Sequence, residues 1–219
     1  MSWHPLLLSL QVAVAATGLA GLLGVALAAL LARPRLPGRD LIDVLVTAPM
    51  VLPPTVLGYY LLVLLGRTSP VGQAFEAVTG ISIVFTPVGA VVAATLGALP
   101  LVVKSTRAAL EAIDPTLVQA ARTLGATPLR AFVTVELPLA VRGVIAGLML
   151  GFARALGDFG VTLMVAGNIP GETRTASLAI YTAIQAGKAD EAHTFILLLT
   201  VVGVVPLYVA TKLGRRAHG

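Results

Sequence analysis

The sequence predicts an all-α fold, a polytopic membrane bundle of about five transmembrane helices. Its 219 residues are 57% hydrophobic and only 11% charged, and the mean hydropathy is +0.94. Soluble domains carry roughly a quarter charged residues, so these charges are too few to cover a water-soluble globule. Uncharged runs of about 20 residues, long enough to cross a bilayer, recur along the chain. Lipid is therefore part of the solvent of this protein.

The runs that are long and apolar enough to span a membrane are residues 6–32, 44–65, 81–103, 143–166 and 194–211. We expect residues 1–219 to form a single transmembrane domain built on these spans. A further uncharged run, residues 176–187, is too short to span, and we expect it to form a partly buried helix on the outer side. The first run has no basic segment before it and no small-residue cleavage site after it, which argues against a removable signal peptide.

The distribution of basic residues predicts which side of the membrane each loop faces. If the N-terminus lies outside, the inner segments hold eleven of the 15 Lys and Arg residues, and the outer segments hold three. Cytoplasmic loops are enriched in Lys and Arg, so we expect the C-terminus and the long loop 104–142 to be cytoplasmic. This topology accounts for the net charge of +5. No basic patch interleaved with aromatic residues indicates nucleic-acid binding.

Loop 104–142 carries the signals of two short helices. Asp114-Pro115 is typical of an N-cap followed by the first helical residue, and Gly125 is typical of the position just after a helix. Thr127-Pro128 repeats the start signal, and Pro138 predicts a helix end before the next span. From spacing alone, an amphipathic connector lying on the membrane and a docking surface for a partner are equally good interpretations.

One motif in this loop resembles a known family. The pattern E-A-A-x3-G-x9-I-x-L-P marks the permeases of ABC importers, and this chain matches it except for Gln in place of the acid and Val in place of Ile. The resemblance implies a type I ABC importer permease fold (MetI-like). It also implies that the loop is the coupling element that contacts the ATP-binding subunit, through Gln119, Ala120, Ala121, Gly125, Val135, Leu137 and Pro138.

Further segments resemble the molybdate branch of that family: residues 49–60, 153–160, 167–175 and 178–181. Asp158 stands where this branch usually has Glu. The resemblance implies a homodimer in the bacterial inner membrane, two copies of the ATP-binding subunit and an external molybdate-binding protein. It implies inward transport of molybdate with no cofactor. Sulfate permeases share parts of these motifs, so tungstate, sulfate and thiosulfate remain alternatives.

Three groups of residues are candidates to line or brace the transport pore or to contact the binding protein on the outer side. Pro53 and Pro54 lie within a predicted span and indicate either a bent, pore-lining helix that moves or a static kink. Arg154 and Asp158 are four residues apart, which favours a structural or gate-bracing ion pair over a substrate contact. The outer-loop residues Thr173, Arg174 and Thr175 are candidates to contact the binding protein, or they form a solvated turn.

Other classes of function find little support in the sequence. The phosphate-binding loop G-x4-G-K-[ST] is absent, so ATP hydrolysis is expected from a separate chain. The three histidines are far apart, which predicts no metal site, and no nucleophile–base arrangement indicates an enzyme. An ion-gradient-driven secondary transporter is expected to show internal repeats and several intramembrane acids. Only Asp158 fits that description.

Overall fold

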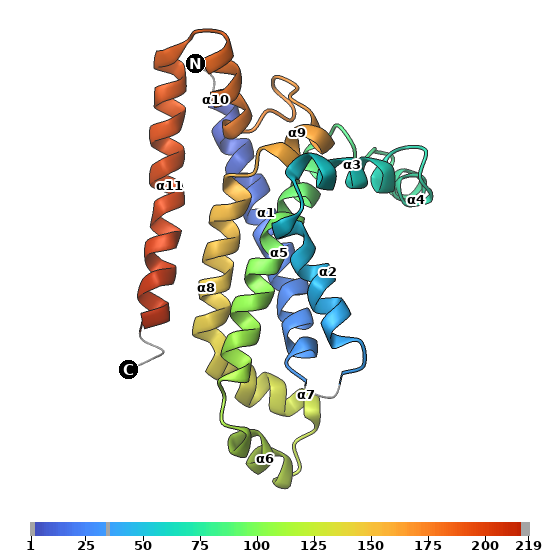
Figure 1. Cartoon of the computed structure of the whole chain (residues 1–219), viewed down its shortest axis with the longest axis vertical. Helices are drawn as coiled ribbons and strands as arrows, with labels where there is room; N and C mark the ends of the chain where they lie inside the picture. The colour runs from blue at the N-terminus through green and yellow to red at the C-terminus, as the bar shows by residue number, and fades with distance from the viewer. Residues whose placement is uncertain (1–2, 34–35, 216–219) are drawn as a thin grey trace.

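A computed structural model describes residues 3–33 and 36–215 of the chain, and within them it contains helices and no strands. Four helices are long and apolar enough to cross a membrane. They run side by side along the length of the molecule (Figure 1) and are α1 (His4–Leu31), α5 (Pro87–Glu111), α8 (Leu137–Leu156) and α11 (Ala189–Arg215). A fifth candidate span is a bent pair of shorter helices. The expected all-α membrane bundle of about five spans is confirmed.

Small residues hold the centre of the bundle together. The core between α1, α5 and α8 includes Ala16, Ala20, Ala94 and Ala98, which are fully buried. Small side chains let helix backbones approach closely, which is how membrane helices associate when lipid removes the hydrophobic driving force. At Gly143 of α8, an added Cβ would lie 2.3 Å from the Cβ of Ala109 on α5. This helix pair therefore depends on a missing side chain.

The predicted span 44–65 is not one continuous helix, and the bend that the sequence indicated at Pro53 and Pro54 is a complete break. The structure has α2 (Arg39–Val51) and α3 (Pro54–Leu65), and the chain bends by 116° between them. Pro53 and Pro54 remove two backbone donors at this point. Leu52, which precedes Pro53, takes an extended conformation, as residues before proline do. The prolines therefore break the helix instead of kinking it, and α3 lies across one end of the bundle (Figure 1).

The helix end predicted at Pro138 is also wrong. The chain runs as one helix from Pro128 to Leu156, through α7 (Pro128–Ala131), the π-helical turn η1 (Phe132–Glu136) and α8. In an α-helix the ring of Pro138 would clash with the carbonyl of Thr134, four residues earlier. The π-turn widens the helix here, and Leu137 donates to the Phe132 carbonyl, five residues back. The wider turn accommodates the proline without ending the helix.

The predicted span 143–166 is divided in a similar way. Helix α8 ends at Leu156, a non-helical turn covers residues 157–159, and the short helix α9 (Gly160–Ala166) follows. Figure 1 shows α9 beside α3 at the end of the bundle opposite α6. Sequence hydropathy gave no sign of this break, because both helices and the turn are largely apolar.

The same end of the bundle carries two further short helices. Helix α4 (Pro70–Thr79), which was not expected, follows α3. Helix α10 (Ala176–Gln185) lies in the run 176–187 and is partly buried, as expected. Its first N–H, from Ala176, donates to the hydroxyl of Ser9 on α1 at 2.7 Å. Helix α1 begins at this end and α11 runs away from it (Figure 1), so α1 starts and α11 finishes at opposite ends of the bundle.

Ion pairs join the helices at the end of the bundle that is nearer to α6. The α5 residues Lys104 and Arg107 both contact Asp43 of α2, at 2.7 and 3.3 Å, and Arg107 also binds Glu111 at 2.8 Å. Glu111 pairs in turn with Arg39, whose Nε donates to the Leu31 carbonyl at the end of α1. The sequence analysis counted Lys104 and Arg107 as loop charges, whereas they lie in α5 and join α1, α2 and α5.

Candidate functional site

Helix α6 (Pro115–Thr123) lies beyond the end of the bundle that the charge pattern assigns to the cytoplasm (Figure 1). Asp114 caps its N-terminus by accepting the Thr116 N–H at 2.9 Å, and Pro115 follows as the first helical residue. Both assignments confirm the sequence prediction. The hydrogen bond from Thr116 lowers the pKa of the exposed Asp114 carboxyl. The capped helix therefore loses this contribution to stability as the pH falls through that lowered pKa.

Gly125 ends this helix with the geometry expected for glycine. Its φ is +89°, in the left-handed region that a residue with a Cβ adopts only under strain. The Gly125 N–H donates to the Arg122 carbonyl at 3.0 Å, and the Ala126 N–H donates to the Ala121 carbonyl at 3.1 Å. These two bonds form a Schellman motif. Thr127 then caps α7 by accepting the Arg130 N–H at 3.3 Å, so the predicted second start is confirmed.

The surface of α6 is exposed although part of it is apolar. None of its residues is buried, and the exposed fractions are 49% for Leu117, 89% for Leu124 just after the helix and 73% for Leu129 in α7. Of the motif residues on α6, Gln119 and Ala120 are exposed and Ala121 is half-buried. Contiguous exposed apolar residues on a loop outside the lipid are typical of a protein–protein contact.

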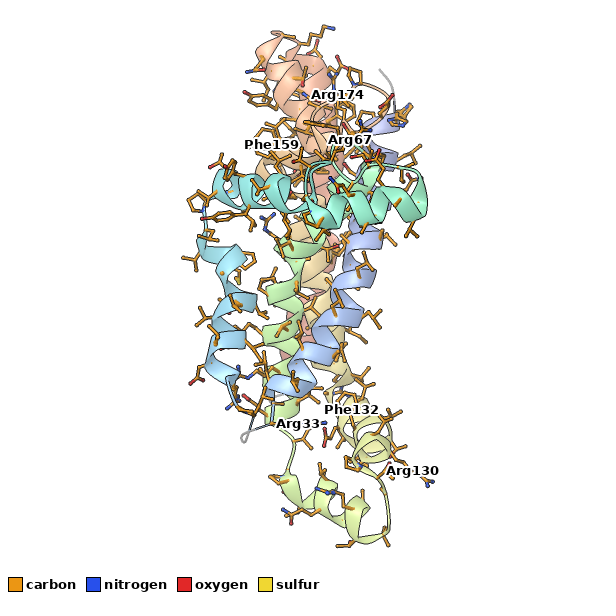
Figure 2. All side chains as sticks on the ribbon, turned by 90° about the vertical axis from the view of Figure 1, so that its right-hand side faces the viewer. Arg33, Arg67, Arg130, Phe132, Phe159 and Arg174 are labelled. Atoms are coloured by element: carbon orange, nitrogen blue, oxygen red, sulfur yellow. The ribbon has the colours of Figure 1, made fainter. Side chains whose placement is uncertain are left out.

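The second half of the motif lies where this loop joins the bundle. Val135 and Leu137 are half-buried at the π-turn, and Pro138 is exposed directly after it. Helix α6 contacts η1, so the two halves of the motif meet in space. Figure 2 shows Phe132 of η1 close to the bundle and Arg130 of α7 further out along the same helix. A force applied to α6 would therefore reach α8 through its contacts with α7 and η1, which begin the continuous helix Pro128–Leu156.

The outer-loop candidates form a closed network of their own. Thr173 is fully buried, and its hydroxyl accepts the Ile169 N–H at 3.1 Å. Arg174 donates through Nε to Asn168 at 2.8 Å, and Asn168 donates to the Thr182 hydroxyl of α10 at 3.0 Å. The network draws the residue 167–175 loop onto the end of the bundle.

This burial corrects part of the sequence interpretation. Thr173 and Thr175 are buried, with 0% and 5% of their surface exposed, so neither presents a side chain to an external protein. Their side chains are therefore not part of a solvated turn, and a contact of this loop with the binding protein stays a prediction. Arg174 is half-buried and lies at the outer end of the molecule in Figure 2. Burial of Thr173 and Thr175 could have been predicted from the sequence, because the residues that follow Thr175 are uncharged and mostly small.

Arg154 and Asp158 meet at the break between α8 and α9. The guanidinium Nη1 of Arg154 lies 3.0 Å from Oδ1 of Asp158, which is 3% exposed. The other carboxylate oxygen accepts both the backbone N–H and the hydroxyl of Thr162, at 3.0 and 2.6 Å. Asp158 therefore both pairs with Arg154 and caps the start of α9. Thr162 was not among the residues predicted from the sequence, although its position four residues after Asp158 could have indicated the cap.

No group of three or more His, Cys, Asp or Glu residues able to hold a metal ion occurs in residues 3–33 and 36–215. The polar groups described above are instead paired within the chain.

The chain is similar to known permeases over nearly all of its length. A family described as "Binding-protein-dependent transport system inner membrane component" matches residues 20–217. The molybdenum transport system permease protein ModB of Escherichia coli (strain K12) is 42% identical, over 97% of this chain and 93% of that protein. The protein of the same name from Haemophilus influenzae is 43% identical, over 95% and 92%. The sulfate transport system permease protein CysT of Salmonella typhimurium is 35% identical, over 91% and 73%.

Solved structures agree on the fold. A chain of the MetNI methionine ABC transporter in an inward-facing conformation has a TM-score of 0.70 at 18% identity, covering 97% of this chain and 94% of that one. A chain of a bacterial alginate ABC transporter, in complex with a pentasaccharide-bound periplasmic protein, has a TM-score of 0.70 at 17% identity, covering 97% and 78%. The chain thus belongs to the inner-membrane components of binding-protein-dependent transport systems, and it is a type I ABC importer permease, a membrane transport subunit and not an enzyme.

Proposed function

We propose that this permease carries molybdate into the cytoplasm. The observation that carries the proposal is the 42% identity to a molybdenum transport permease over 97% of the chain. The sulfate permease is less similar, at 35%, but its similarity still covers 91% of this chain. Sulfate is therefore the second candidate. Molybdate and sulfate are both tetrahedral dianions, so a permease path suited to one also suits the other.

The proposal includes three protein partners. An ATP-binding subunit docks on α6, whose exposed Ala120 and Leu117 lie beside the half-buried Ala121. An external molybdate-binding protein delivers the anion at the end that carries α4 and α10. A second copy of this chain completes the path, so that the assembly holds two ATP-binding subunits.

The exposed side of α2 and α3 supports the second copy as a partner. Many of its large apolar side chains are more than half exposed: Leu41, Val44, Leu45, Met50, Val51, Tyr59, Tyr60, Val63 and Leu64. Lipid alone could cover the aliphatic residues. Lipid could not cover the non-helical backbone between α2 and α3, because unpaired backbone groups require protein or water at membrane depth. A homodimer interface or a shared path along this side satisfies that requirement.

Transport then follows from the movement of α6. When the two ATP-binding subunits close on ATP, they displace the α6 helices, and the continuous helix from Pro128 to Leu156 transmits that displacement to the outer half of the bundle. The path changes from inward-facing to outward-facing and receives the anion from the binding protein. This permease supplies the path, and its partners supply the energy and most of the selectivity.

The test is ATP-dependent uptake by the reconstituted assembly. The permease is purified with its ATP-binding subunit, incorporated into liposomes and supplied with the binding protein and radioactive molybdate. We expect uptake that requires ATP and is competed by unlabelled molybdate far better than by sulfate. Radioactive sulfate uptake that excess molybdate fails to reduce would assign the chain to the sulfate alternative.

A further inference from the structure

The two helix breaks of this protein touch one another. Gly160, the first residue of α9, packs against Pro54, the first residue of α3, so closely that a Cβ on Gly160 would lie 2.7 Å from the Pro54 Cβ. The break before α3 and the break before α9 therefore adjoin. Figure 2 agrees, because Phe159, in the turn before α9, lies at the level of α3. Two non-helical segments thus meet at one place in the bundle.

Arg154 stands at the same depth as these breaks. Helix α2 has 13 residues and rises about 20 Å from Arg39, which pairs with Glu111 at the inner end of α5. The Arg154 guanidinium packs over Gly97, where an added Cβ would lie 3.5 Å from Cζ. Gly97 precedes Glu111 by fourteen residues of α5, so it lies about 21 Å above the same ion pair. Both features fall within a hydrocarbon core of about 30 Å.

The surface around the breaks is unsuited to lipid. Pro53, Thr55 and Gly157 are exposed in the single chain, and the Arg154 side chain is 39% exposed. Non-helical backbone at this depth is tolerated where protein or a water-filled cavity meets it. A guanidinium within a span likewise faces protein or water. The non-helical backbone and the Arg154 guanidinium both need protein or water around them, and they lie close together. We take this as a sign that a polar path for the ion passes the two helix breaks.

The charge of Arg154 is only partly compensated there. Asp158 shares its negative charge with the Thr162 N–H and hydroxyl at the start of α9, through Oδ2. Only Oδ1 binds Arg154. A guanidinium carries five N–H donors in a fixed plane that matches an oxyanion, and the bond to Asp158 uses one of them. The pair therefore leaves a cationic face directed away from Asp158.

We infer that Arg154 contacts the transported oxyanion in the outer half of the membrane and that Asp158 holds its guanidinium in position. The inference rests on the proposed function as an oxyanion importer and adds a contact residue to it. A partly compensated cation suits passage, because a site on a transport path must bind firmly enough to admit the ion and weakly enough to release it. The sequence alone favoured a bracing ion pair over a substrate contact. Because Asp158 also accepts two hydrogen bonds at the start of α9, it neutralises Arg154 less, which favours the substrate contact.

The absence of cysteine in the chain allows a direct test of charge at this position. In the reconstituted assembly, Arg154→Cys is expected to reduce molybdate uptake about tenfold or more, as loss of a charge-assisted hydrogen bond does. A methanethiosulfonate reagent that carries an ammonium group should then restore uptake several-fold. The matching reagent that carries a sulfonate should not. Thr79→Cys, at the exposed end of α4, is the control and should respond to neither reagent.

Three results would overturn the inference: full uptake by Arg154→Cys, no reaction of the introduced thiol with either aqueous reagent during transport, or equal recovery with both reagents. If Arg154→Cys does not assemble, Arg154→Lys and Arg154→Gln replace it. The lysine variant should retain uptake with a raised apparent Michaelis constant, and the glutamine variant should lose it. Equal behaviour of these two variants contradicts the inference.

The same assembly separates this inference from the identity of the ion. Stimulation of ATP hydrolysis by the binding protein reports whether the permease couples at all, and it is measured for the unmodified permease and for the Thr79→Cys control. If the unmodified permease carries sulfate in place of molybdate, all arms are repeated with sulfate. In that case the proposed ion is wrong, while dependence of sulfate uptake on the charge at position 154 still supports the contact.

Discussion

The loops at the two ends of the bundle contrast in what covers them. At one end, the loop 167–175 buries Thr173 completely and pairs Asn168 with both Arg174 and Thr182. At the other end, α6 buries none of its residues and leaves Leu124 89% exposed. The polar side chains of the outer loop find their partners within this chain. The inner loop has capped helix ends, but its side chains stay exposed. The difference indicates that the residues of the outer loop stabilise the fold of this chain, whereas the exposed residues of the inner loop bind a partner.

The largest expected effect is on coupling. Ala121→Asp places a charge on the exposed apolar face of α6, and Gly125→Val forces a β-branched residue to φ +89°, at a strain of about 1 kcal/mol or more. Both variants should abolish uptake and lose the ATP-binding subunit on purification. Because α6 has no buried residues, both should still insert and dimerise. Thr79→Ala at the other end is the control. Normal coupling in both variants would remove the main support for α6 as the docking element.

The outer loop should give the opposite result. Asn168→Ala leaves the Nε donor of Arg174 and the hydroxyl acceptor of Thr182 without their shared partner, at a cost of about 1–3 kcal/mol. We expect a lower midpoint of thermal unfolding in detergent, with normal co-purification of the ATP-binding subunit. Glu172→Gln, at an exposed position of the same loop, should change neither quantity. If Asn168→Ala left the stability unchanged but lost the ATP-binding subunit, the outer loop would serve binding and not stability, contrary to our expectation.

An intermediate effect is expected where the inner loop joins the bundle. Pro138→Ala removes the ring that requires the π-turn, so η1 can become α-helical and rotate α6 relative to α8. Coupled uptake should fall several-fold without loss of stability, because alanine favours a helix. Spin labels at Thr123→Cys and Val141→Cys, in otherwise unchanged and Pro138→Ala chains, measure the rotation as a shift in their distance. An unshifted distance would show that the proline does not set the position of α6.

The smallest effect is expected at Leu124. Its side chain is 89% exposed, and exposed substitutions usually change stability by less than about 0.5 kcal/mol. Leu124→Ser should therefore leave the unfolding midpoint unchanged and weaken association with the ATP-binding subunit only a few-fold. The measurement is a titration of ATP hydrolysis against the concentration of that subunit. Marked destabilisation by this variant would mean that Leu124 packs within the permease itself.

Local signals in the sequence predicted local structure well. Asp114, Gly125 and Thr127 each perform the capping role that their residue type and neighbours indicated. These positions are decided by backbone geometry within four or five residues, which a sequence displays directly. The overall membrane class was equally predictable, because hydropathy is a property of composition.

Tertiary contacts decided the features that sequence reasoning missed. Pro53 and Pro54 break their helix and Pro138 does not, although the sequence predicted a bend at the proline pair and a helix end at Pro138. The π-turn absorbs one proline, and the packing of Gly160 on Pro54 fixes the other break. Burial of Thr173 likewise depends on how segments pack, which periodicity does not report.

We expect the exposed face of α6 to be the docking surface for the ATP-binding subunit. Site-directed cross-linking tests it most directly, because the chain has no cysteine of its own. Ala120→Cys introduces a thiol on α6 that is small enough to preserve the surface, and Thr79→Cys introduces one at the other end. With a short bifunctional reagent and the assembled transporter, we predict a cross-link from position 120 to the ATP-binding subunit and none from position 79. A transporter that hydrolyses ATP and imports its anion, yet yields no such cross-link from position 120, would contradict the account.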